Sequence, residues 1–305
     1  MKKLTIGTRG SKLALWQANY ISSLLKDLFQ GQIELKIIKT KGDKILDSPL
    51  AKIGDKGLFV KEIETALLNK EVDLAVHSMK DLPTDIPSGL TICGATKRED
   101  PRDAFISLNC TCLNDLPPSA KVATSSLRRK SQLLNLRSDL TFVDIRGNVE
   151  TRLKKLEEGQ FDALIMAVAG VKRLGLESVI RQVIPTEISL PAVGQGMVAV
   201  EAREDDKKIL GLIDKISQPE SMIMGAAERA LMKRLEGGCQ VPIGALADVD
   251  GQMVKMRAMV ASLDGKEMVK GSIEGPTSEA AALGVKLANE LLASGAGRIL
   301  EEIRS

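Results

Sequence analysis

Four short segments place cationic or hydroxyl side chains directly after a predicted β-strand. They are GTRGS with Arg9 and Ser11, VHSMKDLP with Lys80, TSSLRRK with Thr124, Ser125, Ser126, Arg128 and Arg129, and IRGN with Arg146, followed by Arg152. Hydroxyls and free N–H groups at a helix start bind anions, and arginine adds a bidentate fork for carboxylates. The alternative for each segment is a capped helix with a solvated basic face. Together, the four segments predict a site for an anionic ligand at the carboxyl ends of the strands.

Asp81 is the acidic exception among these segments. Beside Lys80 and in cationic surroundings, its carboxylate should stay ionised, where it can stabilise a developing positive charge or transfer a proton. The alternative is an ordinary Asx turn before Pro83. His77, the only histidine, ends an apolar strand and is also consistent with a satisfied, half-buried imidazole.

The segment RLEGGCQVPIG holds Cys239 behind two glycines. Two glycines permit unusual backbone angles and close approach of other atoms, which a buried structural thiol does not need. The alternative is a turn entering a strand, with the thiol as a small hydrophobic filler. A second glycine-bearing segment, the loop predicted from Thr40 to Gly57, contains Lys52 and Lys56 and has the length of a functional lid or clamp. It lacks the GK[ST] ending of a phosphate-binding loop.

Composition narrows the class of protein. A chain of 305 residues, 44% of them hydrophobic and 27% charged, is long enough for two or three globular domains. Only 2% of its residues are aromatic, so the cores must be aliphatic, and stacking platforms for single-stranded nucleic acid are scarce. A net charge of +3 is too small to indicate a polyanionic partner. We therefore expect no nucleic acid among its partners.

The N-terminal MKKLTIGTRGSK has no apolar run behind its lysines, and no stretch approaches the length of a membrane span. We therefore expect a cytoplasmic protein with no membrane partner and with its four cysteines as free thiols (Cys93, Cys110, Cys112 and Cys239). Their spacing fits no zinc site, and one histidine excludes a histidine-rich site, so no metal is expected.

Strand and helix patterns alternate over the first hundred residues, which predicts a mostly parallel, covered sheet. The charged segment 97–103 breaks this pattern, and a second alternating unit follows it. A Pro/Gly break at 189–196 is followed by one more strand and helix. After Pro219 a helix leads into short strands joined by two Asp-Gly hairpin signals, which predicts an α+β unit with an antiparallel sheet.

The motifs in combination resemble those of the hydroxymethylbilane synthase family, also called porphobilinogen deaminases. The likeness runs through GTRGSKLALWQ, KGDKILDSPLAKIGDKGLFVKE, DLAVHSMKDLP, REDPRDAF, TSSLRR, RGNVETRL, AVAGVKRLGL, PAVGQG and RLEGGCQVPIG, which covers nearly the whole chain. The resemblance implies that four porphobilinogen molecules are joined head to tail with release of ammonia, and that water then releases hydroxymethylbilane. It also implies that Cys239 carries a dipyrromethane cofactor through a thioether bond.

The fold that the resemblance implies has three domains, two of them like the lobes of periplasmic binding proteins. The expected divisions are 1–96 with 197–216, 102–190, and 219–305, with interdomain crossings at 97–101 and 191–196. The third domain is small and α+β, and carries the cofactor cysteine.

The resemblance also assigns site residues. Asp81 matches the family's catalytic aspartate, which would stabilise a cationic, azafulvene-like species formed by deamination. Each pyrrole carries an acetate and a propionate, and the residues suited to bind these carboxylates are Arg9, Ser11, Lys80, Thr124, Ser126, Arg128, Arg129, Arg146, Asn148, Arg152, Arg173 and Gln195. Lys52, Lys56 and Phe59 fall in the implied active-site loop. Asp55 departs from the second glycine common in the family and adds a negative charge to this loop.

Two other classes of protein remain open at this stage. A two-lobed carboxylate receptor without catalysis would use the same arginines but would leave the Cys239 loop unexplained. A cysteine hydrolase would use Cys239 and His77. The expected partner is the small molecule porphobilinogen, and the expected state is a monomer.

Overall fold

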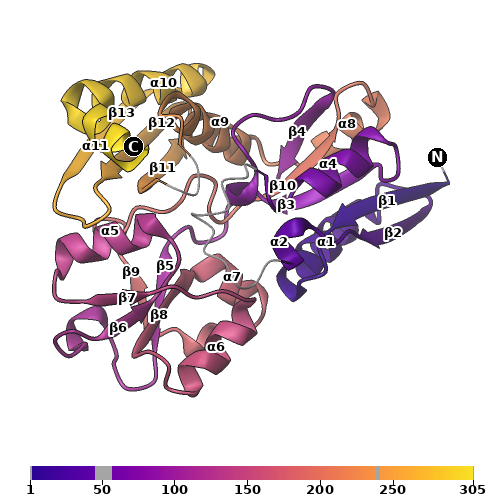
Figure 1. The fold of residues 1–305 in the computed structure, drawn as a ribbon. Coiled ribbons are helices and arrows are strands. Elements are labelled where there is room, and N and C mark those ends of the chain that lie inside the picture. The colour runs from indigo at the N-terminus through magenta and orange to yellow at the C-terminus, as the bar shows by residue number, and fades with distance from the viewer. Residues whose placement is uncertain (1, 45–56, 238–240, 305) are drawn as a thin grey trace. The chain divides into compact units, whose positions relative to one another are not determined.

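The computed structural model describes residues 2–44, 57–237 and 241–304. Its residues group into two compact units (Figure 1). Of the described residues, the first unit contains 2–44, 57–99 and 196–222, and the second contains 100–195, 223–237 and 241–304. No helix within the described ranges is long and apolar enough to cross a membrane.

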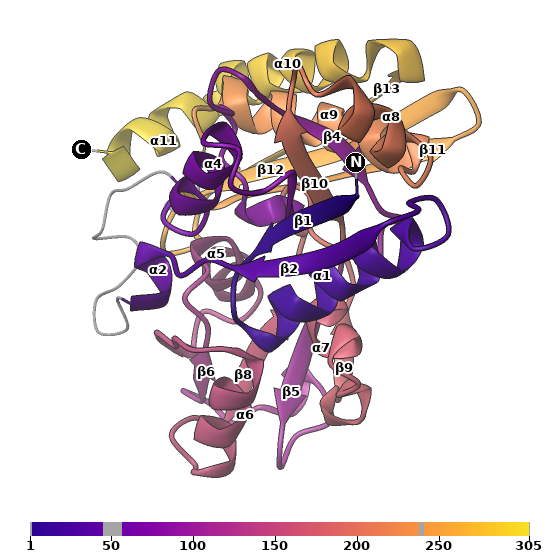
Figure 2. The same ribbon diagram turned by 90° about the vertical axis from the view of Figure 1, so that its right-hand side faces the viewer.

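The first unit is built on a five-stranded sheet in the order β2-β1-β3-β10-β4. Its strands are β1 (Lys3–Thr8), β2 (Gln32–Ile37), β3 (Leu74–Ser78), β4 (Leu90–Ala95) and β10 (Val198–Arg203). The first three are parallel, and β10 runs antiparallel to both of its neighbours. The helices are α1 (Lys12–Leu25), α2 (Lys41–Lys44), α4 (Lys61–Leu68) and α8 (Lys207–Asp214), with a 3-10 turn η1 (Met79–Asp81) after β3 (Figure 2).

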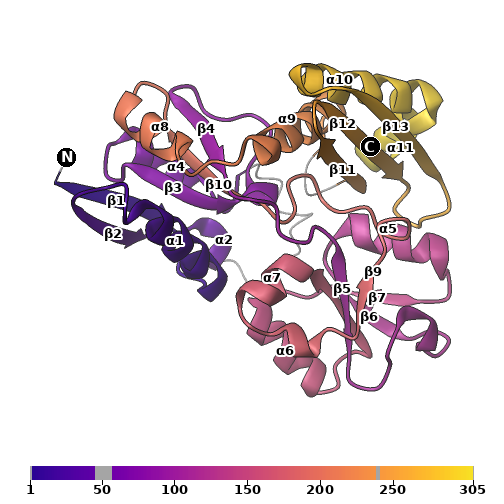
Figure 3. The same cartoon turned by 180° about the vertical axis from the view of Figure 1, so that it is seen from behind.

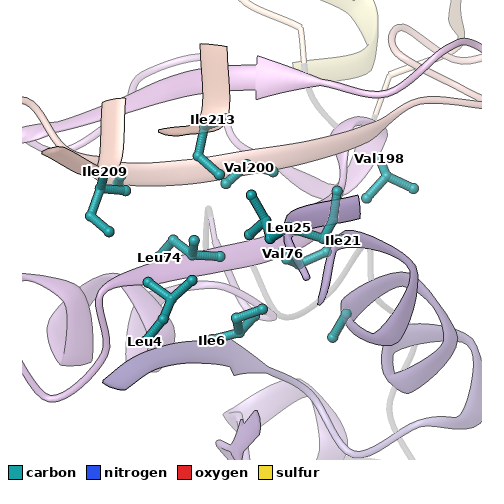
Figure 4. Packing of buried hydrophobic residues seen from close by; sticks show 12 residues of the cluster. Leu4, Ile6, Ile21, Leu25, Leu74, Val76, Val198, Val200, Ile209 and Ile213 are labelled. Atoms are coloured by element: carbon teal, nitrogen blue, oxygen red, sulfur yellow. The ribbon is translucent and has the colours of Figure 1, made fainter. Parts of the chain in front are cut away.

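Aliphatic clusters lie on both faces of this sheet. On one face Leu74 and Val76 of β3 pack with Ile21 of α1 and Ile213 of α8 (Figure 4). On the other face Ala75 packs with α4 residues in a separate cluster. The alternation along β3 therefore assigns residues 74 and 76 to one face and residues 75 and 77 to the other.

The second unit contains a sheet of the same pattern, in the order β7-β6-β8-β5-β9. Its strands are β5 (Asp103–Ser107), β6 (Lys121–Ala123), β7 (Thr141–Val143), β8 (Ala163–Ala167) and β9 (Gln182–Ile184). Again three strands are parallel, and the fourth, β5, is antiparallel to β8 and β9. The helices are α5 (Leu127–Leu136), α6 (Val149–Glu157) and α7 (Val168–Arg173), with short 3-10 turns η2 (Leu113–Asp115) and η3 (Glu177–Val179).

The same unit also contains a three-stranded antiparallel sheet, β11 (Ile243–Asp250), β12 (Met253–Ala261) and β13 (Met268–Pro276) (Figure 3). Its two turns contain Gly251 and Gly265, both with positive φ, as the Asp-Gly signals predict. The accompanying helices are α9 (Pro219–Arg234), α10 (Ala280–Leu291) and α11 (Gly297–Arg304). A 3-10 turn η4 (Thr277–Glu279) precedes α10, and a π-helical segment η5 (Leu292–Ala296) follows it.

The expected α/β class with a final antiparallel sheet is confirmed, and three details differ. The strands β4, β5 and β9 are not among those predicted, and β5 begins at Asp103, inside the segment interpreted as a break. The predicted loop from Thr40 begins with the short helix α2. The sheets are mostly parallel as predicted, but in each of them one strand, β10 or β5, runs opposite to the other four.

Candidate active site

A pocket lies at the carboxyl ends of β1 and β3 in the first unit. The residues that line it are Arg9, Ser11, Leu13, Ala14, Gln17, Phe59, Val60, Val76, His77, Ser78 and Asp81. Parallel strands bring their carboxyl ends to one edge of the sheet, so residues that follow β1 and β3 meet there. Two of the four predicted segments, GTRGS and VHSMKDLP, therefore contribute to one site.

Arg9 lies in the pocket with a carboxylate and an aromatic ring as neighbours. Its Nε lies 3.1 Å from Asp43 Oδ1, and its guanidinium carbon lies 4.3 Å from the centre of the Phe59 ring. Burial alone would raise the pKa of Asp43, but hydrogen bonds from Arg9 and Thr40 outweigh it and lower this pKa. A ligand carboxylate at Arg9 would thus share the guanidinium with Asp43.

The Phe59 ring packs against Gly42, where there is no space for a side chain. A Cβ built on Gly42 would lie 2.2 Å from the Phe59 ring, so any other residue would displace the ring that supports Arg9. Asp43 and Gly42 both belong to α2, and sequence analysis assigned neither of them to the site. Both lie in the segment KGDK, which falls within the predicted loop from Thr40 to Gly57 but forms a helical turn in the structure.

Two hydroxyls line the same pocket. Ser11 is the N-cap of α1, and its Oγ accepts a 3.2 Å hydrogen bond from the Ala14 N–H, which leaves the hydroxyl proton for another acceptor. Ser78 Oγ accepts from Gln17 Nε2 at 2.8 Å. Gln17 was missed by sequence analysis, although a glutamine on the buried face of an amphipathic helix is a recognisable signal.

Asp81 ends the 3-10 turn η1, and its side chain is exposed. The turn begins with Met79, whose N–H donates to Met197 O at 3.1 Å. Within the described residues the Asp81 carboxylate makes no hydrogen bond. An Asx turn at this position would need the N–H of residue 83, which is a proline without one. The carboxylate is therefore available to a ligand in the pocket.

The segment TSSLRRK starts α5 in the second unit. Ser126 is the N-cap, accepting from Arg129 N–H at 3.4 Å, and Thr124 Oγ1 accepts from Ser126 N–H at 3.3 Å. The predicted N-terminal hydroxyls are thus present, and they already satisfy backbone donors at the start of α5.

Lys80, in the first unit, is half-buried in the turn η1 that follows β3.

Arg128 and Arg129 are buried and share one carboxylate, Asp103. Arg128 Nη1 lies 2.9 Å from Asp103 Oδ2, and Arg129 Nη2 lies 2.7 Å from Asp103 Oδ1. Burial alone would raise the pKa of Asp103, but its attraction to Arg128 and Arg129 holds this pKa far below the usual range. Two guanidiniums and one carboxylate leave one positive charge, and Arg128 Nε is a buried donor without a hydrogen-bond partner among the described residues. The cluster therefore retains capacity for one anionic group.

Ser189 and Gln195 complete this network. Ser189 Oγ donates to Asp103 at 3.0 Å, and Gln195 Nε2 donates to Asp103 at 3.0 Å and to Pro101 O at 2.6 Å. The sequence pattern does not single out Asp103 or Ser189, because both lie in segments that it marks only as breaks in the strand and helix alternation. No local pattern links Asp103 to these arginines, because they lie 25 and 26 positions away along the chain.

The remaining predicted arginines lie at other element ends of the second unit. Arg146 follows β7, Arg152 lies in the first turns of α6 with its Nε 2.9 Å from Gly147 O, and Arg173 ends α7; all three are half-buried. Asn148 is the N-cap of α6 and accepts from Thr151 N–H at 2.8 Å. Its amide NH₂ is left for an acceptor.

Three further predicted residues, Lys52, Lys56 and Cys239, and the departing Asp55, lie outside the described residues. Among the residues that are described, no three His, Cys, Asp or Glu side chains are grouped to hold a metal ion.

Two α/β sheets of one strand order, with anion-suited residues after their parallel strands, define an α/β protein built on two similar sheets. The model of the family described as "Porphobilinogen deaminase, dipyromethane cofactor binding domain" matches residues 4–211, and "Porphobilinogen deaminase, C-terminal domain" matches residues 223–293. The chain belongs to the porphobilinogen deaminase family. It is thus a transferase of tetrapyrrole biosynthesis with a dipyrromethane cofactor.

Individual relatives agree over the full length. The porphobilinogen deaminase of Syntrophomonas wolfei is 52% identical over 305 residues, covering 100% of both chains. That of Geobacter sulfurreducens is 53% identical over 304 residues, covering 99% of this chain and 95% of the relative. Among solved structures, the methionine-binding protein MetQ aligns with a TM-score of 0.46 at 15% identity, over 70% of this chain and 89% of that one.

Proposed function

We propose that this chain condenses four porphobilinogen molecules into hydroxymethylbilane, and that Asp81 is its catalytic residue. The observation that supports the proposal is the exposed Asp81 carboxylate beside Arg9 and Ser11, in one pocket at the carboxyl ends of β1 and β3. Loss of ammonia from the aminomethyl carbon of porphobilinogen leaves a cation conjugated with the pyrrole. A carboxylate without other hydrogen bonds can stabilise this cation and take up the pyrrole proton.

Arginines would bind the acetate and propionate groups. We assign this role to Arg9, Lys80 and Ser11 in the first unit, and to Arg128, Arg129, Arg146, Arg152, Arg173, Thr124, Ser126, Asn148 and Gln195 in the second. Arg128 and Arg129 would do so together with Asp103, offering one net positive charge and the unpartnered Arg128 Nε. In this cluster Asp103 would hold the two guanidiniums in place, and their remaining positive charge would bind a ligand carboxylate.

The dipyrromethane cofactor, attached to Cys239, supplies the terminal pyrrole carbon to which new units are added. The described residues fit its carboxylates, because the Asp103 cluster carries an excess positive charge and a buried orphan N–H donor. Asn148 and Ser126 would orient carboxylates at the starts of α6 and α5. Lys52, Lys56 and Phe59 would belong to a loop over the substrate.

We further propose a three-domain division at the boundaries given above, with the cofactor cysteine in the third domain. The protein would act as a cytoplasmic monomer on a small-molecule substrate, with no nucleic-acid or membrane partner. Size-exclusion chromatography with light scattering would check the oligomeric state.

The mass of the denatured protein tests the proposed function. It should exceed the sequence mass by two porphobilinogen units less their ammonia, and Cys239→Ser should lack this addition. Cys112→Ser is the matched control and should retain it. A wild-type protein that turns over porphobilinogen at full rate without any adduct would refute the cofactor assignment, and absence of turnover in adduct-bearing protein would refute the catalytic one.

A further inference from the structure

Three ionisable side chains are buried on the α4 face of the first sheet. His77 and Glu64 are 5% exposed and Glu201 is 0% exposed. His77 on β3 pairs with Ala199 on β10, so Glu201, two residues along β10, lies on the same face as His77. His77 Nε2 lies 3.1 Å from Glu201 Oε2, without the ring N–H being aligned on that oxygen.

The two carboxylates of this cluster are not equivalent. Burial and the nearby charge of Glu201 raise the pKa of Glu64 to about 7, partly offset by His77 and Lys61. Among the described residues, His77 is the group with which Glu201 forms an ion pair. Glu201 is therefore the carboxylate nearest the imidazole Nε2, and Glu64 is a carboxylate that holds a proton more readily than an exposed glutamate.

The cluster adjoins the active-site pocket through β3. His77 itself lines the pocket with Asp81, and it immediately precedes Ser78 and the turn η1 that ends at Asp81. On the opposite face of β3, Leu74 and Val76 pack in a mainly aliphatic cluster, and the Met79 N–H donates to the carbonyl oxygen of Met197, the residue before β10. Contacts of His77 thus fix the end of the strand from which Asp81 projects.

We propose that His77 and Glu201 are positioning residues for Asp81, acting through the contact between the imidazole Nε2 and the Glu201 carboxylate, whereas Glu64 has no such role. The inference concerns the catalytic turn and rests on the proposed role of Asp81. It assigns no proton transfer to His77 and needs no contact of His77 with substrate.

Porphobilinogen turnover by Glu201→Gln tests this proposal, with Glu64→Gln as the matched control. Glu201→Gln should lower kcat ~10–100-fold with little change in KM, because a misplacement of about 1 Å at a catalytic group has that scale. Glu64→Gln, which mimics a protonated carboxyl, should remain within about threefold of wild type. His77→Gln provides a second variant should Glu201→Gln fail to fold, and it should reproduce the loss of kcat.

Introducing Glu201→Gln into the Asp81→Asn protein distinguishes a residue that positions Asp81 from one with a purely structural role. A residue that acts through Asp81 loses its effect once the carboxylate is gone, so Glu201→Gln should cause no further loss there. Additive losses in this background, or equal losses in Glu64→Gln and Glu201→Gln, would overturn the proposal.

A readout independent of turnover uses the single histidine. Side-chain ¹⁵N spectra contain the signals of one imidazole. We expect a proton on Nε2, and we expect the Nε2 resonance to shift more in Glu201→Gln than in Glu64→Gln. Equal shifts, or a proton found on Nδ1 alone, would overturn the inference. An inactive wild type with the expected spectra would instead refute the proposed function and leave the contact standing.

Discussion

At the scale of single residues, the structure separates side chains that only stabilise the fold from those available to a ligand. Asp103 satisfies two arginines, a serine and a glutamine, all in the second unit. Asp81, in contrast, makes no hydrogen bond within the described part of the chain. Two aspartates of one sequence thus differ in role because their surroundings differ.

Replacing Asp81 by Asn should lower turnover at least ~100-fold, the usual scale for a positioned acid–base group, with a near-normal melting temperature. The amide keeps the shape but has neither the charge nor a useful proton affinity. Asp81→Glu should keep part of the activity, and intact-mass spectra should count partial pyrrole chains on Cys239. Near-wild-type turnover of Asp81→Asn would show that the catalytic acid lies elsewhere.

Arg128→Leu and Arg146→Leu should differ in stability, although both should impair turnover. Removing Arg128 leaves Asp103 fully buried with one partner fewer, which typically costs about 3–5 kcal/mol of unfolding free energy. Arg146 is half-buried at a strand end, so its loss should cost about 1 kcal/mol. Urea denaturation measures both, and equal stabilities would contradict the assigned Asp103 network.

At the scale of elements, helix starts serve as caps and as candidate anion sites at once. Asn148 caps α6 through its carbonyl oxygen, and Ser126 caps α5 through its hydroxyl. A cap alone explains their residue types, so only a change that keeps the cap and alters the charge can separate the two roles.

Asn148→Asp is that change. Aspartate caps helices as well as asparagine, and its charge is favourable at the helix N-terminus, so the melting temperature should not fall. If Asn148 contacts substrate or cofactor carboxylates, the added charge repels them and should lower turnover ~10-fold. Unchanged turnover in a porphobilinogen assay would reduce Asn148 to a cap.

Docking of α4 should depend on pH through Glu64. Burial and the nearby Glu201 raise its pKa to about 7 in the folded protein, from the ordinary glutamate value of 4.5, so its stabilising contribution is complete below pH 4.5 and is lost as pH rises through 7. Glu64→Gln should therefore be more stable than wild type at pH 8, by up to about 3 kcal/mol at ~1.4 kcal/mol per pKa unit, and similar near pH 4. Urea denaturation at both pH values checks this, with exposed Glu157→Gln as the control that should show no such change. A pH-independent difference would exclude ionisation of Glu64 as its cause.

At the scale of the whole molecule, the predicted carboxylate-binding residues belong to the parts of the chain that build the two sheets of one strand order, and none belongs to the described part of the third, antiparallel sheet. An excess of buried and half-buried cations is costly without an anionic partner. A covalently attached ligand that binds only the folded chain should stabilise it by the general linkage between binding and folding.

Cys239→Ser, which should lack the cofactor, is therefore expected to melt at a lower temperature than the wild type. Thermal unfolding checks this, and the control Cys112→Ser should melt close to the wild type. Equal melting temperatures of Cys239→Ser and adduct-bearing wild type would show that the cofactor carboxylates do not compensate the arginine cluster.

The sequence by itself determined the local elements and the family. The Asp-Gly pairs predicted the two hairpin turns, and the alternating strand and helix patterns predicted the α/β class, both of which are confirmed. These features depend on neighbours within a few residues, which a sequence displays directly. The motifs around Asp81 and Cys239 likewise indicated the family without any structure.

Only the tertiary structure decided which charged groups meet. Asp103 contacts Arg128 from 25 positions away and Ser189 from 86 positions away, and Glu201 reaches His77 through the antiparallel return of β10. No local period encodes such pairs, because they arise from the order of strands in a sheet and not from spacing along the chain. The same long-range pairing brings β4 and β5 into the sheets as strands. Burial then determines which carboxylates are neutralised and which, like Asp81, remain available for chemistry.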